Sequence, residues 1–151
     1  MYSKIFLLDN DQKETQMLME SMPHLKLDYS ANIEVTADHL KMLFSRLHQV
    51  LVQYAGAELN RCQSRAVCCE NFYVGDGGEN RAFVHLQALL LEGRTPGQLQ
   101  ETGSELLKVL QEGFKDLLAR YHVQISVHVN EIPADRSFKS NHFPMDLKGR
   151  G

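Results

Sequence analysis

Two hydrophobic periods divide most of the chain into strands and helices. Apolar and polar residues alternate strictly over residues 24–30, where Leu25, Leu27 and Tyr29 share one side. The same alternation returns over residues 123–130, in Val123, Ile125, Val127 and Val129. A period of two is typical of strands that bury one face. We therefore predict strands over these two segments.

Two longer segments follow the period of a helix. Apolar residues recur three and four positions apart from Ala37 to Tyr54, which predicts an amphipathic helix. Thr36 suits its N-cap and Gly56 the position after its end. A second helix is predicted from Pro96, after a capping Thr95, with an apolar stripe made by Leu99, Leu106, Leu107, Leu110, Phe114, Leu117, Leu118 and Tyr121.

Between the helices, residues 64–74 and 81–91 predict two further strands, and residues 75–78 read Gly-Asp-Gly-Gly. A glycine-rich stretch can bind phosphate, but no Gly-Lys-Ser/Thr follows here and the next element has a strand pattern. Asp-Gly between two strand patterns favours a hairpin turn, which is our prediction.

The predicted order is β-α-β, a hairpin, and a second β-α-β. This order predicts an α+β two-layer domain, in which a four-stranded mixed sheet carries two helices on one face. The other face would be bare. Because the strands still offer apolar positions, we expect another copy of the chain to cover it.

Composition limits the classes of function. The chain has 151 residues, 43% hydrophobic and 23% charged, with a net charge of −3, which suits one soluble domain. No basic surface argues for nucleic acid or an anionic membrane. The odd cysteine number, Cys62, Cys68 and Cys69, makes a poor disulfide framework and predicts a cytoplasmic protein.

Residues 1–21 differ from the rest of the chain. Ile5–Leu8 is apolar, but it is too short for a signal-peptide core or a membrane span. We predict a leader or misassigned extension over residues 1–21, a domain over residues 22–147 and a tail over residues 148–151. An extra strand followed by a linker is the alternative for residues 1–21.

Met22-Pro23 looks like a second beginning, directly before the first strand. If the chain started here, removal of the initiator methionine would leave Pro23 with a free secondary amine, which can act as a base. Within a chain, the proline nitrogen is an amide and cannot exchange a proton. The alternative is an ordinary extended residue before a proline.

Seven histidines raise the question of a metal site. They are dispersed and form no His-Glu-x-x-His motif. His85 and His128 lie on predicted strands and could come close together, but a hydrogen-bonded pair on the sheet is favoured over a pair of ligands. We predict no metal site.

Five short pieces together resemble a known family. They are Pro23-His24, Ser64-Arg65, Ala82–His85, Gly93-Arg94 and Ser137–Asn141. Their order and spacing are similar to those of 5-carboxymethyl-2-hydroxymuconate Δ-isomerases, a family of the tautomerase superfamily. The resemblance spans about residues 22–147.

The resemblance implies a trimer built from tandem β-α-β units. It also implies a cofactor-free enzyme in which an N-terminal proline moves a proton on an unsaturated 2-hydroxy dicarboxylic acid while arginines hold the carboxylates. Pro23 matches the proline and Arg94 matches one arginine. Gln63 stands where the resemblance expects a second arginine, so Arg61 or Arg65 could take its place. These five residues are the predicted site, with a small carboxylic acid as ligand.

These observations leave two classes of function. The first is an isomerase that uses Pro23 as its base. The second is a catalytically silent trimeric domain of the same fold that binds a small acid or a protein partner. Attachment of residues 1–21 discriminates between them, because it removes the basic nitrogen of Pro23.

Overall fold

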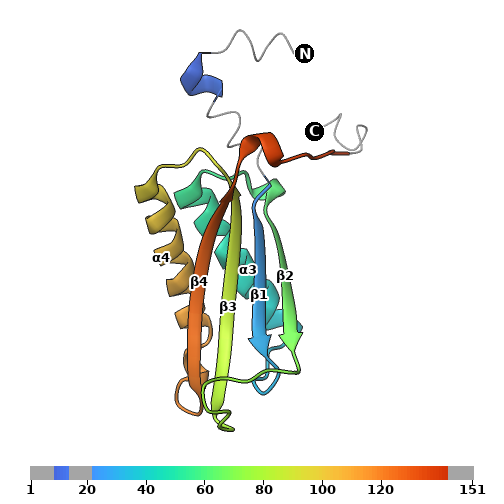
Figure 1. Ribbon diagram of the computed structural model, residues 1–151, viewed down its shortest axis with the longest axis vertical. Coiled ribbons are helices and arrows are strands. Elements are labelled where there is room, and N and C mark those ends of the chain that lie inside the picture. Colours follow the sequence, from blue (N-terminus) through green and yellow to red (C-terminus); the bar gives the residue numbers. More distant parts are fainter. Residues whose placement is uncertain (1–8, 14–21, 143–151) are drawn as a thin grey trace.

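The computed structural model describes residues 9–13 and 22–142, and the predicted tail 148–151 lies outside them, as does most of the predicted leader. Four strands and two long helices form the domain (Figure 1). The elements are, in chain order, β1 (His24–Ser30), α3 (Ala37–Ala55), η1 (Leu59–Arg61), β2 (Gln63–Cys69), β3 (Arg81–Leu91), α4 (Pro96–Gly113), η2 (Lys115–Leu117), β4 (His122–Ile132) and η3 (Ala134–Arg136).

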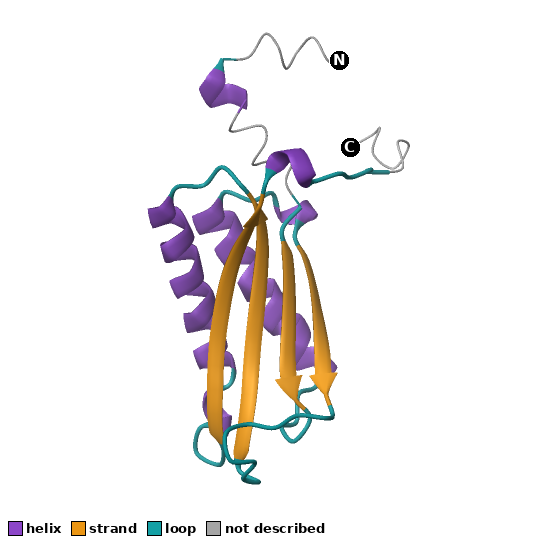
Figure 2. Cartoon of the chain, viewed as in Figure 1, coloured by secondary structure: helices purple, strands orange, loops and turns teal. Residues whose placement is uncertain are grey.

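The strands form one mixed sheet in the order β2-β1-β3-β4. β1 runs parallel to β2 and antiparallel to β3, and β3 runs parallel to β4. Each parallel pair encloses one helix in the sequence, so β1-α3-β2 and β3-α4-β4 are tandem β-α-β units, as predicted. Both helices cover the same face of the sheet (Figure 2), which confirms the two-layer architecture.

The core lies between the sheet and the helices. It is made by the alternating residues of β1 and β3 and by the apolar stripes of the helices, among them Leu25, Leu27, Leu47, Leu51, Leu86, Leu106 and Leu110, all fully buried. Each helix begins with the predicted threonine cap: the Thr36 hydroxyl accepts from His39 N, and the Thr95 hydroxyl accepts from Gln98 N. Gly56 ends α3 at φ 69°, a conformation that favours glycine.

The opposite face of the sheet is open and largely polar. Register places His24, Lys26 and Asp28 of β1 on it, next to odd-numbered residues of β3 and, beyond these, the even-numbered residues of β4. Apolar side chains are fewer there than the sequence suggested, although Leu89 and Val67 remain 40% and 39% exposed. A second copy covering this face would therefore meet a mixed surface rather than an apolar one.

The predicted hairpin between the second and third strands is wrong. β2 and β3 do not pair, because β1 lies between them. Residues 70–80 are a connection that passes the end of β1 (Figure 1). The Asp-Gly turn is present, and Asp76 accepts from Gly78 N and Arg81 Nε, but it shapes a longer loop.

Two element ends also differ from the prediction. β2 stops at Cys69 rather than residue 74, because the chain must leave the sheet edge to reach β3. α4 stops at Gly113, eight residues before Tyr121, and continues as the short η2. A Cβ at Gly113 would lie 2.6 Å from Leu43 Cδ1, so the two helices approach each other where the glycine stands.

Candidate active site

The two units differ in strand length, and the difference leaves a step in the sheet. β1 begins at His24, which pairs with Leu89. β3 continues through Leu90 and Leu91, which pair only with Glu131 and Ile132 of β4. Met22 and Pro23 enter the sheet at this step. The sequence alone predicted both strand ranges, but only the register shows that the strands are offset here.

Pro23 is buried and is fixed by the main chain on its carboxyl side. Its carbonyl oxygen accepts a hydrogen bond from Gln63 N at 3.0 Å, which starts the pairing of β1 with β2. The position of the Pro23 ring is therefore set by backbone pairing rather than by a rotamer. In this chain its nitrogen is bonded to Met22, so it is an amide.

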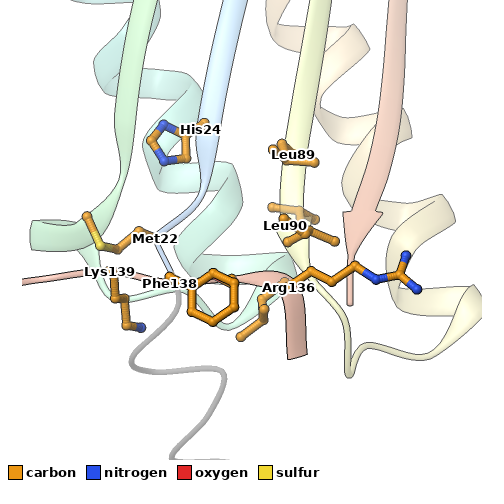
Figure 3. A pocket seen from close by; sticks show the side chains of 10 residues that line it. Met22, His24, Leu89, Leu90, Arg136, Phe138 and Lys139 are labelled. Atoms are coloured by element: carbon orange, nitrogen blue, oxygen red, sulfur yellow. The ribbon is translucent and has the colours of Figure 1, made fainter. Parts of the chain in front are cut away.

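A cavity of about 360 Å³ lies at the step (Figure 3). Its apolar lining comes from Leu89, Leu90, Leu91, Ile132 and Phe138. Its polar lining is His24, Arg136, Ser137 and Lys139, and Met22 also contributes. The described lining includes three basic residue types and no carboxylate. An anion with an apolar body therefore suits it best.

The segment after β4 closes one side of this cavity. Pro133 ends the strand pairing, and η3 turns the chain back over the step. The Glu92 carboxylate accepts a hydrogen bond from Ala134 N and so ties η3 to the end of β3. Arg136 N donates to Pro133 O at 3.0 Å. These contacts place the side chains of residues 136–139 against the cavity.

Arg94 lies just after β3, buried to 6% exposure. Its Nε donates to Ala55 O at 2.6 Å and its Nη1 donates to Leu91 O at 2.9 Å. Ala55 is the last residue of α3, so Arg94 satisfies a helix-end carbonyl of the first unit. Nη2 is buried and has no hydrogen-bond partner among the described residues. One N–H group of this arginine is thus buried without an acceptor in the described part of the chain.

The burial that surrounds Arg94 also acts on its pKa and on that of Cys62. Desolvation lowers the pKa of Arg94, opposed by nearby Glu131 and Cys62, and arginine stays charged because its ordinary pKa is so high. Desolvation raises the pKa of the Cys62 thiol to about 11. At neutral pH this thiol is protonated and is a poor nucleophile.

The other predicted site residues are placed apart from the cavity. Gln63 and Arg65 are exposed and stand opposite His24 and Lys26, so they share the open face of the sheet. Arg61 lies in η1, where its Nε contacts the Glu58 carboxylate at 3.2 Å. The structure brings Pro23 and Gln63 together through the backbone. None of Arg61, Gln63, Arg65 and Arg94 is among the residues that line the cavity.

Sequence reasoning missed His24, Arg136 and Lys139 as cavity residues. Pro23-His24 and Ser137–Asn141 were both part of the family resemblance, but neither His24 nor Lys139 was given a role there. The available signal was Pro133, which ends the alternation of the last strand and predicts a change of direction. The direction in which the chain turns after Pro133 depends on the hydrogen bond from Ala134 N to the Glu92 carboxylate, and Glu92 is distant in the sequence.

His85 and His128 do meet, on the open face. Their ring centroids are 4.6 Å apart at 78°, and His85 Nδ1 lies 2.6 Å from Ser126 Oγ. Burial lowers the pKa of His85, and neighbouring His128 lowers it further. Over residues 9–13 and 22–142, no three His, Cys, Asp or Glu side chains are grouped to hold a metal ion.

Other surfaces of the described chain are less suited to a small acid. A hollow of about 530 Å³ lies by the ends of the helices, but Glu34, Glu112 and Asp116 line it together with Arg46 and Lys115. Its charges are mixed, unlike those of the cavity at the step. In the described part of the chain, no helix is long and apolar enough to cross a membrane.

Solved structures with the same arrangement of elements define the class. A 5-carboxymethyl-2-hydroxymuconate isomerase from Deinococcus radiodurans R1 superposes with a TM-score of 0.75, at 26% identity over 89% of this chain and 99% of that one. A fused 4-OT described as a symmetric trimer superposes with a TM-score of 0.60 at 18% identity, over 84% of this chain and 99% of that one. The fold is that of the tautomerase-like isomerases.

Sequence comparison gives the family. The sequence model for 5-carboxymethyl-2-hydroxymuconate isomerase matches residues 23–146. The 5-carboxymethyl-2-hydroxymuconate Δ-isomerase of Escherichia coli is 27% identical over 120 residues, which cover 80% of this chain and 94% of that protein. The chain therefore belongs to the 5-carboxymethyl-2-hydroxymuconate isomerase family, and the resemblance found in its sequence is confirmed.

Proposed function

We propose that this isomerase moves a proton on an unsaturated 2-hydroxy dicarboxylic acid similar to 5-carboxymethyl-2-hydroxymuconate, with Pro23 as the base once it is N-terminal. The observation that carries the proposal is the position of Pro23. It is buried at the step in the sheet, beside a basic and apolar cavity whose wall includes the preceding residue, Met22. Removal of Met22 would expose the proline nitrogen to that cavity.

The proposed reaction is a proton transfer between two atoms of the substrate. The neutral amine takes the proton of the 2-hydroxyl group, and the electrons of the O–H bond form the C=O bond. The conjugated double bonds shift, and the amine returns the proton to a carbon of the chain. An α-amino group titrates near 7.7–8.0, so about a quarter of it is neutral near pH 7.4, and burial beside cations would lower that pKa and raise the neutral fraction. The transfer needs no metal or organic cofactor.

Arginine contributes through the negative charge of the substrate. Arg94 is the proposed anchor, since its Nη2 is buried and has no partner among the described residues. A guanidinium donor in a water-poor site stabilises a carboxylate and the charge that develops as the proton leaves. We also propose that the domain spans residues 22–147, so that Pro23 is the second residue of the domain.

The decisive experiment compares two forms of the protein. One is the full chain with a verified Met1, and the other begins at Pro23. The Pro23-start form should isomerise 2-hydroxymuconate, with a rate about 10²–10⁴-fold above that of the full chain, the usual contribution of a general base. Loss of the dienol absorbance reports turnover. Equal rates from both forms would contradict the role of Pro23.

The second candidate function is a silent trimeric domain that binds a small acid or a protein. The bond between Met22 and Pro23 in this chain favours it wherever residues 1–21 stay attached. A homotrimer is proposed in both cases, because one whole face of the sheet is open. Light scattering that shows a monomer at micromolar concentration would contradict the trimer.

A further inference from the structure

A dicarboxylate needs a cationic contact for each of its two carboxylates, and the residues predicted from the family resemblance supply no obvious cation for the second one. Gln63 is neutral, and it lies on the open face rather than in the cavity. Arg61 contacts Glu58 through Nε, and although its Nη1 is buried without a partner among the described residues, Arg61 does not line the cavity. Arg94 has given two of its donors to main-chain carbonyl groups. The second carboxylate therefore requires a cation that the chain supplies elsewhere.

The cavity itself has basic groups at its two ends. Figure 3 shows His24 and Lys139 around Met22 at one side, Phe138 with Leu89 and Leu90 in the middle, and Arg136 extending at the other side. The pattern is basic, apolar, basic. It matches a molecule that has a carboxylate at each end of an unsaturated hydrocarbon chain.

Arg136 is well placed to bind the distal carboxylate. Its backbone is held by the η3 turn and by the bond between Ala134 and Glu92. Arg136 lines the cavity, its side chain is 75% exposed, and its Nε lies 4.0 Å from the Asp135 carboxylate. An exposed ion pair at that distance is weak, so the guanidinium can exchange it for a bidentate ligand.

We propose that Arg136 sets the preference of this protein for dicarboxylates by holding the carboxylate farthest from Pro23. Gln63 cannot take this role, because its side chain is uncharged. The proposal rests on the proposed function of the site. Arg136 is a specificity-determining residue here and takes no part in the proton transfer.

Binding tests this proposal without turnover. Muconate and sorbate have the same six-carbon diene, but muconate has two carboxylates and sorbate has one. Titration calorimetry on the full chain should show that Arg136→Gln weakens muconate binding about tenfold, because a charged hydrogen-bond pair is lost, and changes sorbate binding less than about twofold.

Arg120→Gln is the matched control. Arg120 is an exposed arginine just before β4, at the end of that strand away from Arg136, and its guanidinium lies 5.6 Å from the Tyr121 ring centroid. This change removes the same charge without touching the cavity, so both affinities should stay as in the unchanged chain. Circular dichroism shows that each variant is folded.

Three results with the variants would overturn the proposal. They are unchanged muconate binding in Arg136→Gln, an equal loss for muconate and sorbate, and an equal loss in Arg120→Gln, which would indicate long-range electrostatics alone. A full chain that does not bind muconate would also overturn it. None of these results bears on turnover by the Pro23-start form, so the failure of this proposal and that of the proposed function are distinguishable.

Discussion

The two β-α-β units share one element order and differ in length. β1 and β2 have seven residues each, whereas β3 and β4 have eleven each. At one end of the sheet, side chains complete the shorter unit: Ser30 Oγ accepts from Phe83 N, and Asn32 Nδ2 donates to Arg81 O. At the other end the step stays open, and the cavity lies there.

Because of this difference, the two units contribute different parts of the candidate site. The shorter unit supplies Pro23 at the step. The longer unit supplies most of the cavity wall and the segment that carries Arg136, and its Arg94 bonds to the end of α3. The cavity thus lies where the strands of the two units differ in length by a few residues.

The largest effect in this comparison is expected at Arg94, where the longer unit bonds to the shorter one. Arg94→Ala should lower kcat/KM about ten- to a hundredfold in the active form, since a charged hydrogen bond contributes about 1.5–3 kcal/mol. It should also lower the free energy of unfolding, because Ala55 O and Leu91 O lose their donors. Steady-state kinetics and urea denaturation measure the two effects.

Gln63→Ala is the control for Arg94→Ala, because Gln63 is exposed on the open face of the sheet and does not line the cavity, so kcat/KM should stay close to that of the unchanged protein. Unchanged kinetics of Arg94→Ala on every acid tested would remove Arg94 from the site.

A smaller effect is expected where α3 and α4 meet. Gly113→Ala would put a methyl group 2.6 Å from Leu43 Cδ1, and Leu43 is buried. Overpacking of this kind destabilises by about 1–3 kcal/mol, which thermal or urea denaturation would detect. A Cβ at Gly97, in the same helix, would meet no described atom within 4 Å, so Gly97→Ala should be neutral or stabilise by up to about 1 kcal/mol. Equal effects at the two glycines would contradict the close approach of the units.

The smallest effect concerns pH and His48 of the first unit. His48 Nε2 lies 2.6 Å from Ser64 Oγ, and burial lowers its pKa below the ordinary value. The unfolded chain then binds a proton more readily, so stability is complete above about pH 6.5 and falls as pH drops through the folded-state pKa. His48→Gln should reduce this loss between about pH 7.5 and 5, measured by urea denaturation. His122→Gln, at an exposed position, is the control and should retain it.

Periodicity predicted most of the fold, because each amphipathic segment shows by its own pattern which side is buried. The range 24–30 of β1 and 81–91 of β3 agree with the prediction. The hairpin failed because strand order is a contact between distant segments: Asp76-Gly77 has the chemistry of a turn, but β1 occupies the place beside β2.

The site was predicted less completely for the same reason. Pro23 and Gln63 were predicted together only through the family resemblance, and the structure joins them through one backbone hydrogen bond. The hydrogen bond of Arg94 to Ala55 O depends on where α3 ends. The position of Arg136 depends on how the segment after β4 folds back over the step. Neither leaves a periodic signal in the sequence.

The step also has a practical consequence for how the protein is labelled. Met22 and Lys139 both line the cavity, so the described chain enters and leaves the domain at this end of the strands. The exposed loop at residues 76–80 lies at the far end of the strands. A fluorophore or affinity peptide inserted there would lie at the opposite end of the strands from the cavity.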